Sequence, residues 1–118
     1  MGKNGESEAP GINIIGQGTE IKGDINAPGD MRIDGKLTGN FVSNQKLVIG
    51  SDGIIEGNIN CKDCDISGKV VGDMCVTELL ILKSTSDVRG DISTNKLVVE
   101  IDAQFSGVCK MHQDTTKE

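Results

Sequence analysis

The sequence predicts an all-β, single-domain fold: a right-handed parallel β-helix, a three-sided solenoid of about six turns. Two observations predict it. A six-residue unit, x-h-x-G-x-h with h apolar, occurs six times, with its glycines 16, 18, 15, 18 and 17 residues apart. The composition also suits thin stacked layers, because 16 glycines accompany Ile, Val and Leu while Phe41 and Phe105 are the only aromatic residues.

Apolar residues in the six units align as columns, which is the feature that a stacked coil requires. Within each unit the apolar positions are spaced by two, the period of a β-strand. A second apolar pair with the same spacing precedes most units. The six units are Glu20–Ile25, Lys36–Phe41, Ile54–Ile59, Lys69–Met74, Asp87–Ile92 and Gln104–Cys109, and the second pairs are Met31/Ile33, Leu47/Ile49, Cys64/Ile66, Leu80/Leu82 and Leu97/Val99.

A repeat of this length predicts one coil turn of about three short strands, so we expect three parallel sheets around a shared interior. Parallel crossovers are overwhelmingly right-handed, which sets the expected hand. The unit's glycine lies between two inward residues, so we expect a bend there with unusual φ and ψ. A second bend should be short after Ile33 and Ile66 and longer after Ile49, Leu82 and Val99. A β-sandwich is the alternative, but it does not keep six parallel columns.

The domain organisation follows from where the repeat begins and ends. We expect a β-helix over residues 12–111, a disordered polar tail over residues 1–11 and a second disordered tail over residues 112–118. Neither a secretory signal nor an apolar run of about 20 residues is present, which predicts a cytoplasmic protein with reduced cysteines. The net charge of −6 is spread along the chain, and without a basic stripe or aromatic residues nucleic-acid binding is not expected.

The ordered series of turns resembles the bactofilins, bacterial polymer-forming cytoskeletal proteins with a right-handed β-helical core. The stretches Ile15–Ile25, Met31–Phe41 and Leu47–Ile59 carry the resemblance, which extends over about residues 12–111. It implies self-assembly into filaments without nucleotide, and a scaffold for cell shape or for envelope-building or membrane-associated client proteins. Many members reach the inner membrane through an apolar or basic N-terminal segment. Residues 1–11 are polar and rich in glycine here, which argues against direct membrane binding.

The two ends of the coil are the candidate functional sites. Each terminal turn of a solenoid exposes unpaired backbone groups and an uncovered apolar layer, and no amphipathic cap flanks the repeat. An end-on contact of this kind lengthens without closing, which produces a filament. The candidate polymerisation interface consists of Ile12 and Ile14 at one end and Phe105, Cys109 and Met111 at the other.

The residues that could carry chemistry fit structural roles better, and we predict no catalytic, cofactor-binding or metal site. Cys61 and Cys64 form a C-x-x-C, but they fall in apolar columns and lack the further ligands of a zinc site. His112 is the only histidine and lies in the C-terminal tail. Asp24, Asp73 and Asp91 follow glycines and are interpreted as a solvated face.

Two other functional classes remain as alternatives. A hexapeptide-type acyltransferase needs a strict six-residue period and a histidine between subunits, whereas this repeat is 15–18 residues long. A monomeric solenoid that binds a surface or a glycan needs a regular outward ladder of threonine or aromatic residues. The threonines do not form one, so the filament-forming scaffold is the favoured interpretation.

Overall fold

A computed structural model describes residues 13–111, which form fifteen strands and no helix. All strand pairs in this range are parallel, as predicted. The strands are β1 (Asn13–Ile15), β2 (Glu20–Lys22), β3 (Ile25–Ala27), β4 (Met31–Ile33), β5 (Lys36–Thr38), β6 (Phe41–Ser43), β7 (Lys46–Ile49), β8 (Ile54–Glu56), β9 (Ile59–Ile66), β10 (Lys69–Val71), β11 (Met74–Leu82), β12 (Asp87–Arg89), β13 (Ile92–Val99), β14 (Gln104–Ser106) and β15 (Cys109–Met111).

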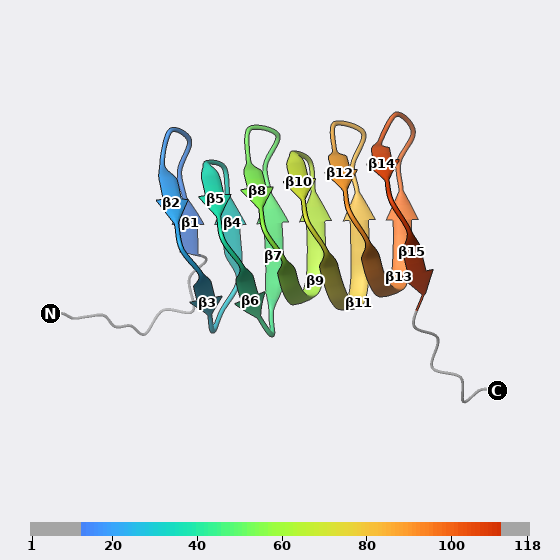
Figure 1. Cartoon of the computed structure of the whole chain (residues 1–118), viewed down its shortest axis with the longest axis horizontal. Helices are drawn as coiled ribbons and strands as arrows, with labels where there is room; N and C mark the ends of the chain where they lie inside the picture. Colours follow the sequence, from blue (N-terminus) through green and yellow to red (C-terminus); the bar gives the residue numbers. More distant parts are fainter. Residues whose placement is uncertain (1–12, 112–118) are drawn as a thin grey trace, which may run out of the picture.

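The described chain winds through six turns stacked along one axis, from β1 at one end of the rod to β15 at the other (Figure 1). Each turn contributes one segment to each of three faces. Face 1 consists of β1, β4, β7 and the second halves of β9, β11 and β13. Face 2 is the six-stranded sheet of β2, β5, β8, β10, β12 and β14, and face 3 consists of β3, β6, the first halves of β9, β11 and β13, and β15.

The number of sheets differs from the expected three, because faces 1 and 3 belong to one nine-stranded sheet. The strands β9, β11 and β13 are eight or nine residues long and run through the corner between these two faces. The register of β11 with both neighbours shifts between Val76 and Leu79, and such an irregularity bends a strand without ending it. The coil is therefore three-sided with only two sheets.

The apolar columns predicted from the repeat are confirmed by the strand register. Ile21, Leu37, Ile55, Val70, Val88 and Phe105 are successive partners across face 2. On face 3, Ile25, Phe41, Ile59, Met74, Ile92 and Cys109 align in the same way. The middle turns bury these side chains completely, so like residues stack on like residues along the axis.

The glycine column adopts the unusual backbone that the repeat predicted. All six repeat glycines have φ between +135° and +152°, a region that L-residues with a side chain rarely adopt. A Cβ atom on Gly57 would also overlap the carbonyl group of Gly39 in the preceding turn. The glycine thus permits both the bend between faces 2 and 3 and the close stacking of turns at that corner.

The bends between faces 1 and 2 have the expected lengths, short after Ile33 and Ile66 and longer after Ile49, Leu82 and Val99. Long bends close with a backbone hydrogen bond across four residues, as from Gly53 N to Gly50 O at 2.8 Å and from Ser86 N to Lys83 O at 2.9 Å. The short bends contain only Asp34-Gly35 and Ser67-Gly68. Every bend between faces 1 and 2 lies at the same edge of the rod, where the loops project at the top of Figure 1.

Candidate functional site

The last turn leaves much of its inward apolar layer uncovered. Val99 is 52% exposed and Met111 is 44% exposed, whereas their partners one turn earlier, Leu82 and Thr94, are fully buried. Leu97, Phe105 and Cys109 complete this layer and are partly buried against the core. We name these five residues, Leu97, Val99, Phe105, Cys109 and Met111, the C-terminal layer.

Three of the predicted interface residues therefore come together at one end of the rod. Phe105 pairs with Val88, Cys109 with Ile92 and Met111 with Thr94, so each lies directly above a buried residue. Because these columns continue without interruption, the C-terminal layer is a cross-section of the core with no seventh turn over it among residues 13–111.

The first turn differs from the expectation. Ile14 pairs with the outward Arg32 and is 63% exposed, so it lies on the outer surface of face 1. The inward position belongs to Ile15, which pairs with Ile33 and is buried. Ile12, the other residue expected at this end, lies outside the described residues, as do His112 and the two expected tails.

Two further apolar residues of the last turn occupy positions that earlier turns give to polar residues. Ile101 is 86% exposed at the tip of its bend, where the other long bends carry Gln17, Ser51 and Ser84. Val108 is exposed at the position after the repeat glycine, where the five earlier turns carry Asp or Asn. An alignment of the six turns carries both signals, because the equivalent positions of the other turns are polar.

Unpaired backbone groups accompany this apolar surface. The repeat glycine of each turn donates its N–H to a carbonyl of the next turn, as from Gly72 to Arg89 and from Gly90 to Ser106, both at 2.9 Å. No further turn follows Gly107 in the described part of the chain to accept the corresponding bond. Such an edge is a template on which another chain can add strands.

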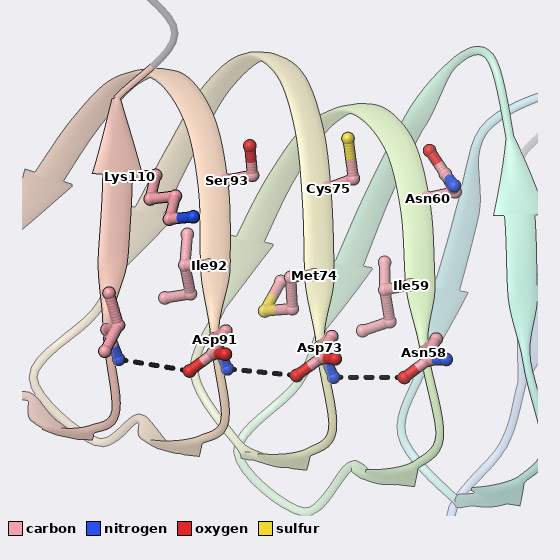
Figure 2. A pocket seen from close by; sticks show the side chains of 11 residues that line it. Asn58, Ile59, Asn60, Asp73, Met74, Cys75, Asp91, Ile92, Ser93 and Lys110 are labelled. Carbon is pink, nitrogen blue, oxygen red and sulfur yellow. Dashed lines mark hydrogen bonds between the residues drawn. The ribbon is translucent and has the colours of Figure 1, made fainter.

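A ladder of side-chain hydrogen bonds runs along the corner beside the glycines. In each of the first five turns an Asp or Asn Oδ1 accepts a bond from the backbone N–H of the equivalent residue in the next turn, over 2.9–3.3 Å, as Figure 2 shows for the last of them. The ladder residues are Asp24, Asn40, Asn58, Asp73 and Asp91, and it ends at the N–H of Val108. Three of these residues were interpreted as a solvated face, so their structural role was missed.

An open groove of about 360 Å³ runs along the outer surface of face 3, between this ladder and an outward row that contains Asn60, Cys75 and Ser93 (Figure 2). Asp73 and Asp91 line it, but one oxygen of each carboxylate is already engaged in the ladder. The groove crosses several turns, and Met74 and Lys110 are long side chains among the mostly short ones that line it. It has the form of a surface furrow, whereas small-molecule sites enclose most of their ligand.

The cysteine pair is part of the core, in agreement with its place in the apolar columns. Cys61 and Cys64 are both buried, and the Cys61 thiol donates to the Asp63 carbonyl at 3.4 Å. Burial, and next the contact with Cys61, raises the pKa of the Cys64 thiol well above its usual value. Among residues 13–111 no cluster of three or more His, Cys, Asp or Glu side chains could hold a metal ion.

Taken together, these features define a class of protein: a parallel β-solenoid whose exposed apolar surface is concentrated at one end. The family model for bactofilins, described as polymer-forming cytoskeletal proteins, matches residues 13–110. The chain therefore belongs to the bactofilin family.

Two relatives from Myxococcus xanthus (strain DK1622) support this membership. Bactofilin BacO is 28% identical over 94 residues, which cover 80% of this chain and 75% of BacO. Bactofilin BacP is 26% identical over 94 residues, covering 80% of this chain and only 39% of BacP. No solved structure matches significantly. No helix in the described range could cross a membrane, since none is long and apolar enough.

Proposed function

We propose that this chain assembles end to end into filaments through its terminal turns. The observation that carries this proposal is the apolar surface of the last turn. The residues of the C-terminal layer are exposed or only partly buried where their counterparts in earlier turns are buried, and Ile101 and Val108 stand where earlier turns carry polar residues. A solenoid that remained monomeric would gain from polar residues there, as in the caps of other repeat proteins. In this proposal the N-terminal interface predicted from Ile12 and Ile14 is carried by Ile21 and Ile25, the partly buried inward residues of the first turn, because the inward Ile15 is already buried.

The energetics favour reversible, concentration-dependent assembly. Full burial of one large apolar side chain contributes about 1.5–3 kcal/mol, and the C-terminal layer is more than half buried already. The rest of the burial would then add roughly 3–4 kcal/mol, and the open strand edges about 1 kcal/mol for each hydrogen bond made. This sum is comparable with the 4–15 kcal/mol that association costs in lost freedom of motion. Small changes at the ends should consequently have large effects on assembly.

Assembly in this proposal needs no nucleotide and involves no catalysis. The sequence lacks the G-x-x-x-x-G-K-[ST] motif that holds phosphates, and the acidic residues of the face 3 groove serve the ladder. The polymer would be a cytoplasmic structural scaffold, with a peripheral place at the inner face of the membrane supplied by client proteins. Membership of a polymer-forming cytoskeletal family supports this role.

Negative-stain electron microscopy of the purified chain tests the proposal directly. The sample is treated with a nucleotide-hydrolysing enzyme and dialysed, so that no nucleotide triphosphate remains. We expect unbranched filaments one rod wide in this sample and the same filaments after ATP is added back. Uniform single rods would favour the surface-binding module, a discrete trimer would favour the acyltransferase architecture, and filaments only with ATP would contradict the nucleotide-independent mechanism.

A further inference from the structure

The contact between successive turns follows one rule at the corner of the repeat glycines. In each of the first five turns the glycine N–H donates to the carbonyl of the residue that precedes the next turn's glycine, as from Gly90 N to Ser106 O at 2.9 Å. The N–H two residues later donates to the carbonyl of the residue that follows that glycine, as from Ile92 N to Val108 O at 2.8 Å. Because five consecutive contacts obey this rule, it defines what a layer on the last turn must offer.

The last turn presents the same donors at the end of the rod, where β14 and β15 form the outermost strands (Figure 1). Among residues 13–111 no turn follows the N–H groups of Gly107 and Cys109. A segment added in the parallel direction can accept both bonds through the carbonyls on either side of its own glycine. Strand addition of this kind is a recurring mode of peptide recognition, in which backbone bonds give affinity and side chains give specificity.

The corner at Gly107 restricts what can be added. The repeat glycines stack so closely that a Cβ atom on one would overlap the carbonyl group of the glycine in the preceding turn, as at Gly107 over Gly90. Gly107 also has a φ of +148°, in a region that residues with a side chain rarely adopt. A segment that continues the stack therefore needs a glycine directly on Gly107.

The positions beside this glycine specify apolar residues. Phe105 and Cys109 are only partly buried and Met111 is 44% exposed, so each accepts an apolar side chain from a further layer. Val108 adds a requirement that the earlier turns lack. They carry Asp or Asn there, whose Oδ1 accepts the next turn's N–H, whereas Val108 offers no acceptor and is 55% exposed. An apolar residue directly after the segment's glycine covers Val108, which gives the pattern h-x-G-h-h-x-h.

We infer that the C-terminal end of the rod binds an extended segment of a partner protein with the pattern h-x-G-h-h-x-h, which adds as parallel strands to β14 and β15 and caps the filament. The binding follows from the open edge, and the capping rests on the proposed end-to-end assembly, since both use the C-terminal layer. The chain's own first turn, Ile21–Ala27, is a poorer match because Asp24 after its glycine would place a carboxylate against Val108. The last unit, Phe105–Met111, has the full pattern, but the preceding turn already occupies the side that would make the contact.

A free peptide of residues 96–111 carries the pattern without the preceding turn and serves as the probe. Its fluorescence anisotropy is measured during titration with the wild-type chain in reducing buffer, below the critical concentration for assembly, where the rods are single. The matched control is the same peptide with Gly107→Ala. We expect saturable binding of the first peptide and binding about ten-fold weaker or more for the control, because its Cβ meets a carbonyl group and its φ is strained.

A variant of the chain and amide exchange locate the contact on the rod. Met111→Lys in the chain should weaken binding about ten-fold, whereas Val42→Glu, on the outer surface of face 3, should leave binding unchanged. The bound peptide should also slow hydrogen–deuterium exchange at the N–H groups of Gly107 and Cys109, because both become donors to its carbonyls. Equal binding of the two peptides, or unchanged exchange at these two groups, would overturn the inference.

Sedimentation of filaments then tests capping. At a peptide concentration ten times its dissociation constant about a tenth of the ends stay free, so the critical concentration should rise about ten-fold, with little effect of the Gly107→Ala peptide. Binding without any rise would refute capping and the proposed assembly surface together, and leave the strand-addition site standing. No binding to single rods, while the wild type still forms filaments, would overturn the inference alone. Tighter binding of a peptide of residues 13–27 would assign the end to the first turn of a second copy and overturn the assignment to a partner protein.

Discussion

Replacing Phe105 by arginine is the sharpest test of the C-terminal layer as the assembly surface. Phe105 has Val88 beneath it and no described residue above it, so in the single rod an arginine can turn its guanidinium into solvent at the end. At a joint between rods the same group would be enclosed in an apolar layer. The substitution should therefore weaken assembly far more than folding.

The loss of assembly free energy follows from the two environments of residue 105, in the single rod and at the joint. The joint loses about 1–2 kcal/mol of apolar burial, because this side chain is already partly buried in the single rod. Desolvating an unpaired charge adds several kcal/mol more. A total of about 4 kcal/mol raises the critical concentration for assembly about a thousand-fold.

Sedimentation of filaments over a concentration series measures the critical concentration, and circular dichroism with thermal unfolding measures the fold. Val88→Arg is the matched control one turn deeper, where the side chain is fully buried, and it should unfold the rod. Phe105→Arg filaments at the wild-type critical concentration would refute the reasoning. A variant that is unfolded at 25 °C would show that Phe105 serves the core alone.

The remaining predictions concern the corner, the ladder and the core. Gly57→Ala should destabilise the rod by roughly 2–4 kcal/mol in urea unfolding, because φ is +152° and the Cβ would overlap Gly39, whereas Gly16→Ala, with open space at its Cβ, should change stability little. Asn58→Ala removes the acceptor of the Asp73 N–H and should lower the free energy of unfolding in urea by about 1–2 kcal/mol. The outward Asn60→Ala should leave it almost unchanged. Because its pKa is raised, the Cys64 thiol stays protonated at pH 8. Iodoacetamide should therefore leave Cys64 and the buried Cys61 unmodified until the protein is denatured, whereas the partly exposed Cys75 should react in the folded protein.

The inward columns could be predicted from the sequence because a parallel coil stacks each residue on its equivalent. The spacing of two within each unit identifies the inward residues, and the glycine fixes the register between turns. The ladder was missed for a related reason. The Asp and Asn residues after the glycines were considered for their charge, although their shared ability to accept a backbone N–H is what the five positions have in common.

The first turn shows where the pattern was insufficient. Ile12 and Ile14 were expected to begin the inward layer, but the bend Gly16–Thr19 is as long as the bend Gly50–Gly53. Aligned on that bend, Ile15 is equivalent to Ile49, which makes Ile15 the inward residue and turns Ile14 outward. A shift of one residue reverses which side chains of a strand point inward. The first strand has no second apolar pair to fix its register, so its inward residue is easily assigned one position too early.

The last turn also allows assembly to be weakened without altering the core. Ile101 and Met111 are the exposed counterparts of Ser84 and Thr94 in the preceding turn, so Ile101→Ser with Met111→Thr restores residues that the coil already accommodates. Thermal unfolding of the single rod should change little. If both side chains are covered at the joint, their loss removes about 2–3 kcal/mol and raises the critical concentration about 30- to 150-fold in sedimentation. Unchanged assembly would contradict this prediction. It would mean that the joint forms elsewhere and that the apolar character of the last turn serves a client protein instead.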